Sequence, residues 1–354
     1  MQRRDFLAGS VAALVSRDSK PRAVKVECVA GGGDMALGGS AIGARLIEPF
    51  GVAFDERGNF YICEHKGQRV TRVDRQGKIT LFAGTGTPGN LNFNDPHGLV
   101  ISRNQQMYIA DTRNHRVIKI DLKTGAHAII AGTGQAGFAG DGGPGAKATF
   151  NGIFAIDLNQ AGDKLYLTDL QNRRIRLLDL KTGIVTTIAG NGQADVPENG
   201  ADAASSPLVD PRATAVDSKG NVYILERRGN ALRVADRQGK IRTLIGPAGS
   251  PHPPRSPRGP ERELNGPKHL CVDRRDLVII ADAENHLIRR FNPKTGTTEV
   301  FAGTGEKGSH LEADDPLRTQ LDRPHGVIVH PYNLAGALYI SDSYNHRVLK
   351  MVGW

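Results

Sequence analysis

Short apolar runs alternate with polar turn residues over most of the chain, and the runs come in groups of four. The first complete group reads GVAFD, FYICE, RVTRVD and KITLFAG, between residues 51 and 84. Gly, Asn or Asp residues lie between successive runs. Short apolar runs bounded by such turn residues are typical of β-strands in antiparallel sheets. Each group therefore predicts a four-stranded unit.

The same group recurs along the chain. We place the start of the units near Pro49, Pro96, Asn151, Pro211, Pro267 and Pro324. Six units of four short strands predict an all-β fold, a six-bladed β-propeller. The sixth unit ends at Trp354 after its third run, and the run KVECVAGGG at 25–33 has no unit before it. Because an open ring would leave strand edges unpaired, we expect residues 25–33 to complete blade six and close the ring.

This organisation divides the chain into an N-terminal tail, residues 1–24, and a single propeller, residues 25–354. The tail contains Arg3 and Arg4 followed by a short apolar run from Leu7 to Val15. It resembles a bacterial twin-arginine export signal, which implies a periplasmic or secreted protein. The alternative is an ordinary disordered tail on a cytoplasmic protein. No later segment is apolar enough to span a membrane.

Composition narrows the function only a little. The 43 glycines suit many tight turns, and three of the strand ends run into G-x-G-x-x-G strings such as AGTGQAG. No helical pattern follows these strings, so we interpret them as turns rather than dinucleotide-binding loops. The three cysteines form no C-x-x-C motif. The net charge of +9 is spread along the chain without interleaved aromatic residues, and an export signal argues against nucleic acid as the partner.

Several units also carry a family resemblance. The strings PHGVIV…LYISDSYNHRVLKM and PHGLVI…MYIADTRNHRVIKI resemble the NHL repeat, and Asn285, His286 and Leu287 reproduce the triplet that gives the repeat its name. The resemblance covers nearly the whole chain after residue 24 and implies the propeller fold. NHL propellers include protein-binding sensors, RNA-binding modules and a zinc-dependent lyase that acts on peptidyl-hydroxyglycine. Function must therefore be argued from the site.

Two sets of side chains are expected on one face of the propeller. The second run of each unit ends in an acid, and these acids are Glu64, Asp111, Asp169, Glu226, Asp282 and Asp342. Since an acid stands at this position in every blade, we expect it to bind loop amides and arginines rather than to catalyse. The second set follows the start of each unit and comprises Phe50, His97, Gly152, Arg212, Lys268 and His325.

The second set differs from blade to blade, so it is the candidate site. We predict that His97, His325, Arg212 and Lys268 bind a small anionic or carbonyl-bearing ligand, or a protein, because cations and imidazoles favour such groups. The resemblance to the lyase implies that His97 and His325 hold a divalent metal such as zinc. A catalytic zinc needs about three protein ligands, and the corresponding position of the other blades offers none. Asp95 and His269 remain candidates for the third ligand, although His269 is displaced by one residue along its strand.

We therefore favour a binding or scaffold module that acts through the face around the central channel. A metal-dependent lyase or lactone hydrolase at the channel mouth is the second hypothesis, and an RNA-binding propeller is the third. The sequence nominates no catalytic residue, and we expect a monomer.

Overall fold

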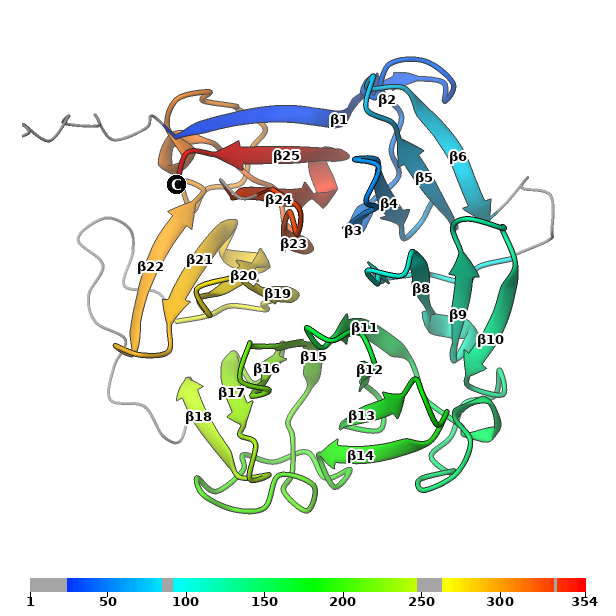
Figure 1. Cartoon of the computed structure of the whole chain (residues 1–354). Helices are drawn as coiled ribbons and strands as arrows, with labels where there is room; N and C mark the ends of the chain where they lie inside the picture. Colours follow the sequence, from blue (N-terminus) through cyan, green and yellow to red (C-terminus); the bar gives the residue numbers. More distant parts are fainter. Residues whose placement is uncertain (1–23, 85–91, 247–262, 334–335) are drawn as a thin grey trace, which may run out of the picture.

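Six antiparallel sheets are arranged in a ring in the computed structural model, which describes residues 24–84, 92–246, 263–333 and 336–354 (Figure 1). Each sheet is one blade whose first strand lies nearest the centre. The predicted six-bladed propeller is confirmed. The proposed export signal in residues 1–23 lies outside the described residues. Among the described residues, no helix has the length and apolar character needed to cross a membrane.

Blades one to three follow one another along the chain. Blade one contains β3 (Pro49–Phe54), β4 (Phe60–Glu64), β5 (Arg69–Val73) and β6 (Ile79–Gly84). Blade two contains β7 (Leu99–Ile101), β8 (Gln106–Asp111), β9 (Arg116–Asp121) and β10 (His127–Ala131). Blade three contains β11 (Ile153–Leu158), β12 (Lys164–Asp169), β13 (Arg174–Asp179) and β14 (Val185–Ala189).

Blades four to six complete the ring. Blade four contains β15 (Pro211–Val216), β16 (Val222–Glu226), β17 (Ala231–Ala235) and β18 (Ile241–Ile245). Blade five contains β19 (His269–Val272), β20 (Val278–Asp282), β21 (Leu287–Asn292) and β22 (Thr297–Ala302). Blade six contains β23 (Gly326–Val329), β24 (Ala337–Asp342) and β25 (Arg347–Val352), and then strands from the other end of the chain.

Those strands are β1 (Lys25–Met35) and β2 (Ile42–Ala44). The strand β1 pairs antiparallel with β25, with Val26 opposite Met351, and it runs along the outside of that blade (Figure 1). This pairing confirms that the N-terminal strand closes the ring. The structure adds a fifth strand to blade six, because β2 pairs with β1 in parallel.

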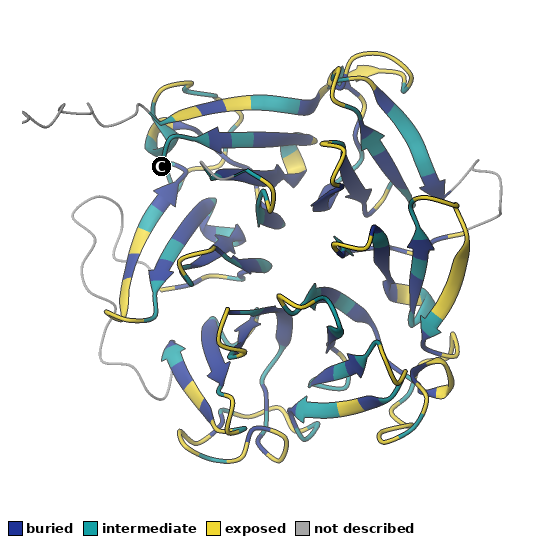
Figure 2. Ribbon diagram, viewed as in Figure 1, coloured by how far each residue is buried: buried dark blue, intermediate teal, exposed yellow. Residues whose placement is uncertain are grey.

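The apolar core is divided into six clusters, one between each pair of neighbouring blades. The first and second strands of the blades have no exposed position, and exposed positions concentrate on the outer strands and loops (Figure 2). The inner strands approach closely at the centre, where a Cβ on Gly326 would overlap the backbone carbonyl of Phe50. Glycine at that position lets blades six and one come together, and it brings the start of their inner strands to one face.

Candidate functional site

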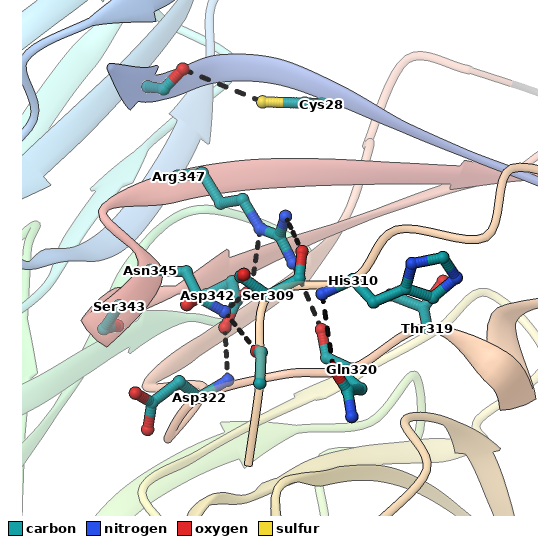
Figure 3. A network of polar contacts seen from close by, with 12 residues as sticks. Cys28, Ser309, His310, Thr319, Gln320, Asp322, Asp342, Ser343, Asn345 and Arg347 are labelled. Carbon is teal, nitrogen blue, oxygen red and sulfur yellow. Dashed lines mark hydrogen bonds and ion pairs between the residues drawn. The ribbon is translucent and has the colours of Figure 1, made fainter. Parts of the chain in front are cut away.

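The six acids at the ends of the second strands are structural, as expected. All are fully buried. In blade six, Asp342 accepts a hydrogen bond from the Asp322 backbone N–H at 2.7 Å, from Asn345 Nδ2 at 2.8 Å and from Arg347 Nε at 2.7 Å (Figure 3). Arg347 in turn donates to the Ser309 carbonyl at 2.7 Å. The acid thus holds the loop that leads into the inner strand.

In the other blades, too, a backbone amide donates to the second-strand acid. This hydrogen bond aligns the starts of the inner strands with one another and corrects one predicted ring residue. The backbone amides that donate to the five other acids are those of Ile47, Asn94, Asn151, Val209 and Asn265. In four of these five blades the donor lies two residues before the leading proline. Blade three has no leading proline, and its donor is Asn151, so Ile153 takes the proline position. The ring residue of blade three is therefore Phe154, and the prediction of Gly152 was wrong.

Contacts between neighbouring blades support this alignment. The Ser343 hydroxyl donates to the Pro49 carbonyl at 2.6 Å, and the Thr112 hydroxyl donates to the Ile153 carbonyl at 2.7 Å. His115 and His346 make a matching pair: their Nδ1 atoms accept from the amides that precede Ile153 and Pro49, at 3.0 and 3.3 Å. These loop residues hold the start of the next blade's inner strand and so orient the ring side chain after it.

Four of the ring side chains, together with His65, form an aromatic cluster at the channel mouth. The Phe50 ring lies between two imidazoles, with centroid distances of 4.6 Å to His65 and 4.3 Å to His325, and both pairs are stacked. His97 contacts His65 at 4.3 Å and Phe154 at 4.4 Å between centroids. The sequence interpretation missed His65. It follows the acid Glu64, and a comparison of the residue after each acid would have placed it beside the ring.

His97 and His325 share one hydrogen-bonding arrangement. The Nδ1 of His97 lies 2.8 Å from the Asp95 carbonyl, and the Nδ1 of His325 lies 2.8 Å from the Arg323 carbonyl. A carbonyl only accepts, so each Nδ1 carries the proton and each Nε2 is left as an acceptor or metal ligand. Burial, followed by the nearby Arg212 charge, holds the pKa of both imidazoles well below its usual value of 6.5. Both rings are therefore neutral at neutral pH.

Arg212 is the most unusual group of the ring. Only 5% of the residue is exposed, and its Nε is sealed from solvent without a hydrogen-bond partner. The guanidinium carbon lies 4.6 Å from the centre of the Phe154 ring. The nearby carboxylate of Asp210 pairs with Arg227 at 2.8 Å instead. Among the described residues, Arg212 therefore has no acidic partner, and burial lowers its pKa to about 9.

Lys268, the second cation of the ring, is half-buried beside Arg212. Its Nζ lies 3.4 Å from Glu284 Oε1, and the other oxygen of Glu284 pairs with Arg323 at 2.9 Å. Burial and then the Arg212 charge lower the pKa of Lys268. Two cations thus lie close together, and the carboxylate that pairs with Lys268 is shared with Arg323. This arrangement favours a bound anion.

The metal hypothesis for His97 and His325 stays a prediction. Phe50 contacts both rings, at 5.1 and 4.3 Å between centroids. The carboxylate of Asp95 pairs with surface cations, Lys66 at 3.3 Å and Arg113 at 2.6 Å. In the described part of the chain, no three His, Cys, Asp or Glu residues are grouped so that they could hold a metal.

A cavity of about 500 Å³ lies in the channel next to this ring, which we call the inner cavity. Gly51, Gly98 and Gly326, each the residue after a ring residue, line one end of it. His269 also lines it, and its Nδ1 is buried without a partner. His269 follows Lys268 on the chain and faces the inner cavity instead of the ring.

Comparison with known proteins agrees with this architecture. Residues 93–120 and 264–291 match the family model of the NHL repeat. The chain is 24% identical over 339 residues to NHL repeat-containing protein 2 of Bos taurus, an alignment that covers 86% of this chain and 46% of that protein. The chain thus spans about half the length of the curated relatives it matches.

Solved structures show the fold. An auxiliary nutrient binding protein of Bacteroides thetaiotaomicron superposes with a TM-score of 0.67 at 14% identity, covering 93% of this chain and 76% of that one. Virginiamycin B lyase of Staphylococcus aureus superposes with a TM-score of 0.54 at 14% identity, covering 93% and 99%.

Five four-stranded blades, a five-stranded blade six and ring closure by the N-terminal strand define the chain as a six-bladed β-propeller. The matches to the NHL repeat family model and to NHL repeat-containing protein 2 confirm the predicted resemblance to NHL-repeat propellers.

Proposed function

We propose that this propeller is a binding module for a small organic anion, with Arg212 as the residue that receives the anionic group. The observation that supports this proposal is the buried guanidinium without an acidic partner. A buried cation is costly unless it is paired, so its presence at the channel mouth favours a carboxylate or phosphate supplied by the ligand. Planar arginine suits bidentate binding of such groups.

The histidines add a second requirement. Each Nε2 of His97 and His325 is an acceptor, which favours a hydroxyl donor on the ligand over a further anionic oxygen. The proposed ligand is therefore an organic anion that also carries hydroxyl groups. The recessed position of Arg212 favours a small molecule over a protein surface. A structural neighbour with the name of a nutrient binding protein supports a binding role on this fold.

Three six-carbon probes test the proposal by isothermal titration calorimetry. Gluconate carries both features, hexanoate only the carboxylate, and sorbitol only the hydroxyls. We expect gluconate to bind more tightly than hexanoate, and sorbitol not to bind. Arg212→Met should weaken gluconate binding by about tenfold or more, because a charge-assisted hydrogen bond is lost. Arg237→Met, which removes an exposed arginine between β17 and β18, is the matched control. Equal binding of gluconate to Arg212→Met and to the control contradicts the proposal.

A metal-dependent lyase or lactone hydrolase is the second candidate. Its support is the hydrogen bond from each Nδ1 to a backbone carbonyl, the arrangement that orients metal-ligating histidines. Elemental analysis of the purified protein separates the two candidates. A stoichiometric divalent metal that is lost in both His97→Ala and His325→Ala supports the metal enzyme. We expect no stoichiometric metal, since a third ligand is missing from the predicted position.

A further inference from the structure

The inner cavity contains a carboxylate that the repeat architecture does not require. Asp157 lies on β11 and lines the inner cavity. The corresponding position of the other five inner strands holds Ala53, Val100, Ala215, Cys271 and Ile328. Five blades therefore form the same strand with an uncharged residue. The carboxylate of blade three needs another explanation.

The Asp157 carboxylate is held by backbone amides and keeps acceptor sites open. The Oδ2 atom accepts a hydrogen bond from the Val216 backbone N–H at 3.0 Å, which joins the inner strands of blades three and four. The Leu158 backbone N–H also donates to this carboxylate. A carboxylate has about four acceptor sites, and among the described residues no ion pair of Asp157 is found. Burial raises the pKa of this carboxyl to about 7. Binding of a cation would offset the cost of its ionisation.

The surroundings of the inner cavity also favour a positive ligand. Its far end is lined by Asp217, Asp273 and Asp276, against the two cations Arg103 and Arg274. The three aspartates hold turns and loops: Asp276, for example, accepts from the Ser218 amide and hydroxyl at 2.9 and 2.8 Å. Asp273 also pairs with Arg275 at 3.0 Å, whereas no ion pair of Asp217 or Asp276 is found among the described residues. The cavity thus has an acidic lining, whereas the ring beside it is cationic.

Shape and wall chemistry indicate the size of the ligand. A volume of about 500 Å³ lies within the range of small-molecule sites, about 300–1,000 Å³. Leu99, Ile156, Leu270 and Val327 supply much of the wall, so an apolar body would be buried well.

We propose that the inner cavity binds an organic cation, a primary ammonium or guanidinium group on an apolar chain, whose charged end donates hydrogen bonds to the Asp157 carboxylate. This site is separate from the anion site at the ring and does not depend on Arg212. The cationic class follows from a buried carboxylate that has no ion-pair partner among the described residues, and the apolar chain from the strand residues that line the wall.

Calorimetry at pH 8, where the Asp157 carboxyl is ionised, tests the proposal with hexylamine and its neutral analogue hexan-1-ol. Hexylamine should bind wild type at least about tenfold more tightly than hexan-1-ol does, since only the ammonium gains a charged hydrogen bond. Asp157→Asn should remove this preference. Asparagine still offers an oxygen to the Val216 amide, so we expect the variant to fold, as a thermal melt will show. Asp34→Asn changes an exposed carboxylate on β1 and is the matched control for net charge.

Each outcome decides the matter. A preference for hexylamine that is kept in Asp34→Asn and lost in Asp157→Asn supports the site. Equal binding of the two probes to wild type, no binding of hexylamine, or a preference that survives Asp157→Asn overturns it. If Asp157→Asn does not fold, the wild-type comparison of hexylamine with hexan-1-ol decides alone. Gluconate titrations are unaffected by any of these results, so a failure here is distinct from a failure of the anion site.

Discussion

Replacement of Arg212 by methionine should make the ligand-free protein more stable. The fall of the Arg212 pKa from 12.5 to about 9 reflects the cost of burying this charge. At about 1.4 kcal/mol per pH unit, that cost is about 5 kcal/mol. An arginine stays protonated at neutral pH, so the cost appears as lost stability rather than as lost charge.

Part of this cost is already offset in the fold. The contact of Arg212 with Phe154 contributes about 1–2 kcal/mol, and the side-chain stem packs against its neighbours. Methionine keeps most of the packing and removes the charge. We therefore expect Arg212→Met to raise the free energy of unfolding by about 2 kcal/mol, with a rise in Tm of a few degrees.

Urea unfolding at pH 7 and low ionic strength measures this change. Arg233→Met is the contrasting variant, because Arg233 is fully buried and pairs with the equally buried Glu226 at 2.6 Å. Its loss leaves an unpaired carboxylate and should destabilise the protein by about 3–5 kcal/mol. A loss of stability in Arg212→Met as large as that in Arg233→Met would show that the Arg212 charge stabilises the fold, and it would contradict an unfavourable buried cation at this position.

Three further predictions concern the ends of the chain and the ring. Deletion of residues 1–20 should leave the melting temperature unchanged, whereas deletion of 1–35 removes β1 and should cause aggregation or a large loss of stability; equal melting curves contradict ring closure. Replacement of Arg3 and Arg4 by lysine should retain the full-length protein in the cytoplasm on cell fractionation, and unchanged export would exclude the twin-arginine route. Burial lowers the pKa of His65 to about 4, so its contribution to stability is present above pH 6.5 and is lost as the pH falls toward 4. The free energy of unfolding, measured from pH 7 to pH 4.5, should therefore fall less steeply in His65→Phe than in wild type. Parallel curves for the two proteins would contradict this.

The repeat pattern made the fold predictable, because every unit repeats the same order of short apolar runs separated by turn residues. The role of the second-strand acids followed from their recurrence. Phe154 was missed because blade three lacks the leading proline that aligns the others, and its position follows from hydrogen bonds such as that of the Asn151 amide to Asp169.

The character of the candidate site was less predictable. The position of His65 beside the ring could have been found by comparing the residues after the acids, but its stacking on Phe50 is a three-dimensional contact. The lack of a partner for Arg212 was also hidden in the sequence, where Asp210 stands two residues before it. The structure pairs Asp210 with Arg227 and leaves Arg212 without an acid.

The most direct test of the anion site is the NMR signal of the Arg212 Nε–H group. This donor is buried and has no partner in the ligand-free protein, so its proton should exchange slowly enough to be observed and should shift strongly downfield when a carboxylate binds. The signal is assigned by its absence in Arg212→Lys, and gluconate is titrated into the wild-type protein. We expect a saturable downfield shift of this signal, with little change of the Arg237 signal. An Arg212 signal that does not move while gluconate binds would contradict an anion site at Arg212.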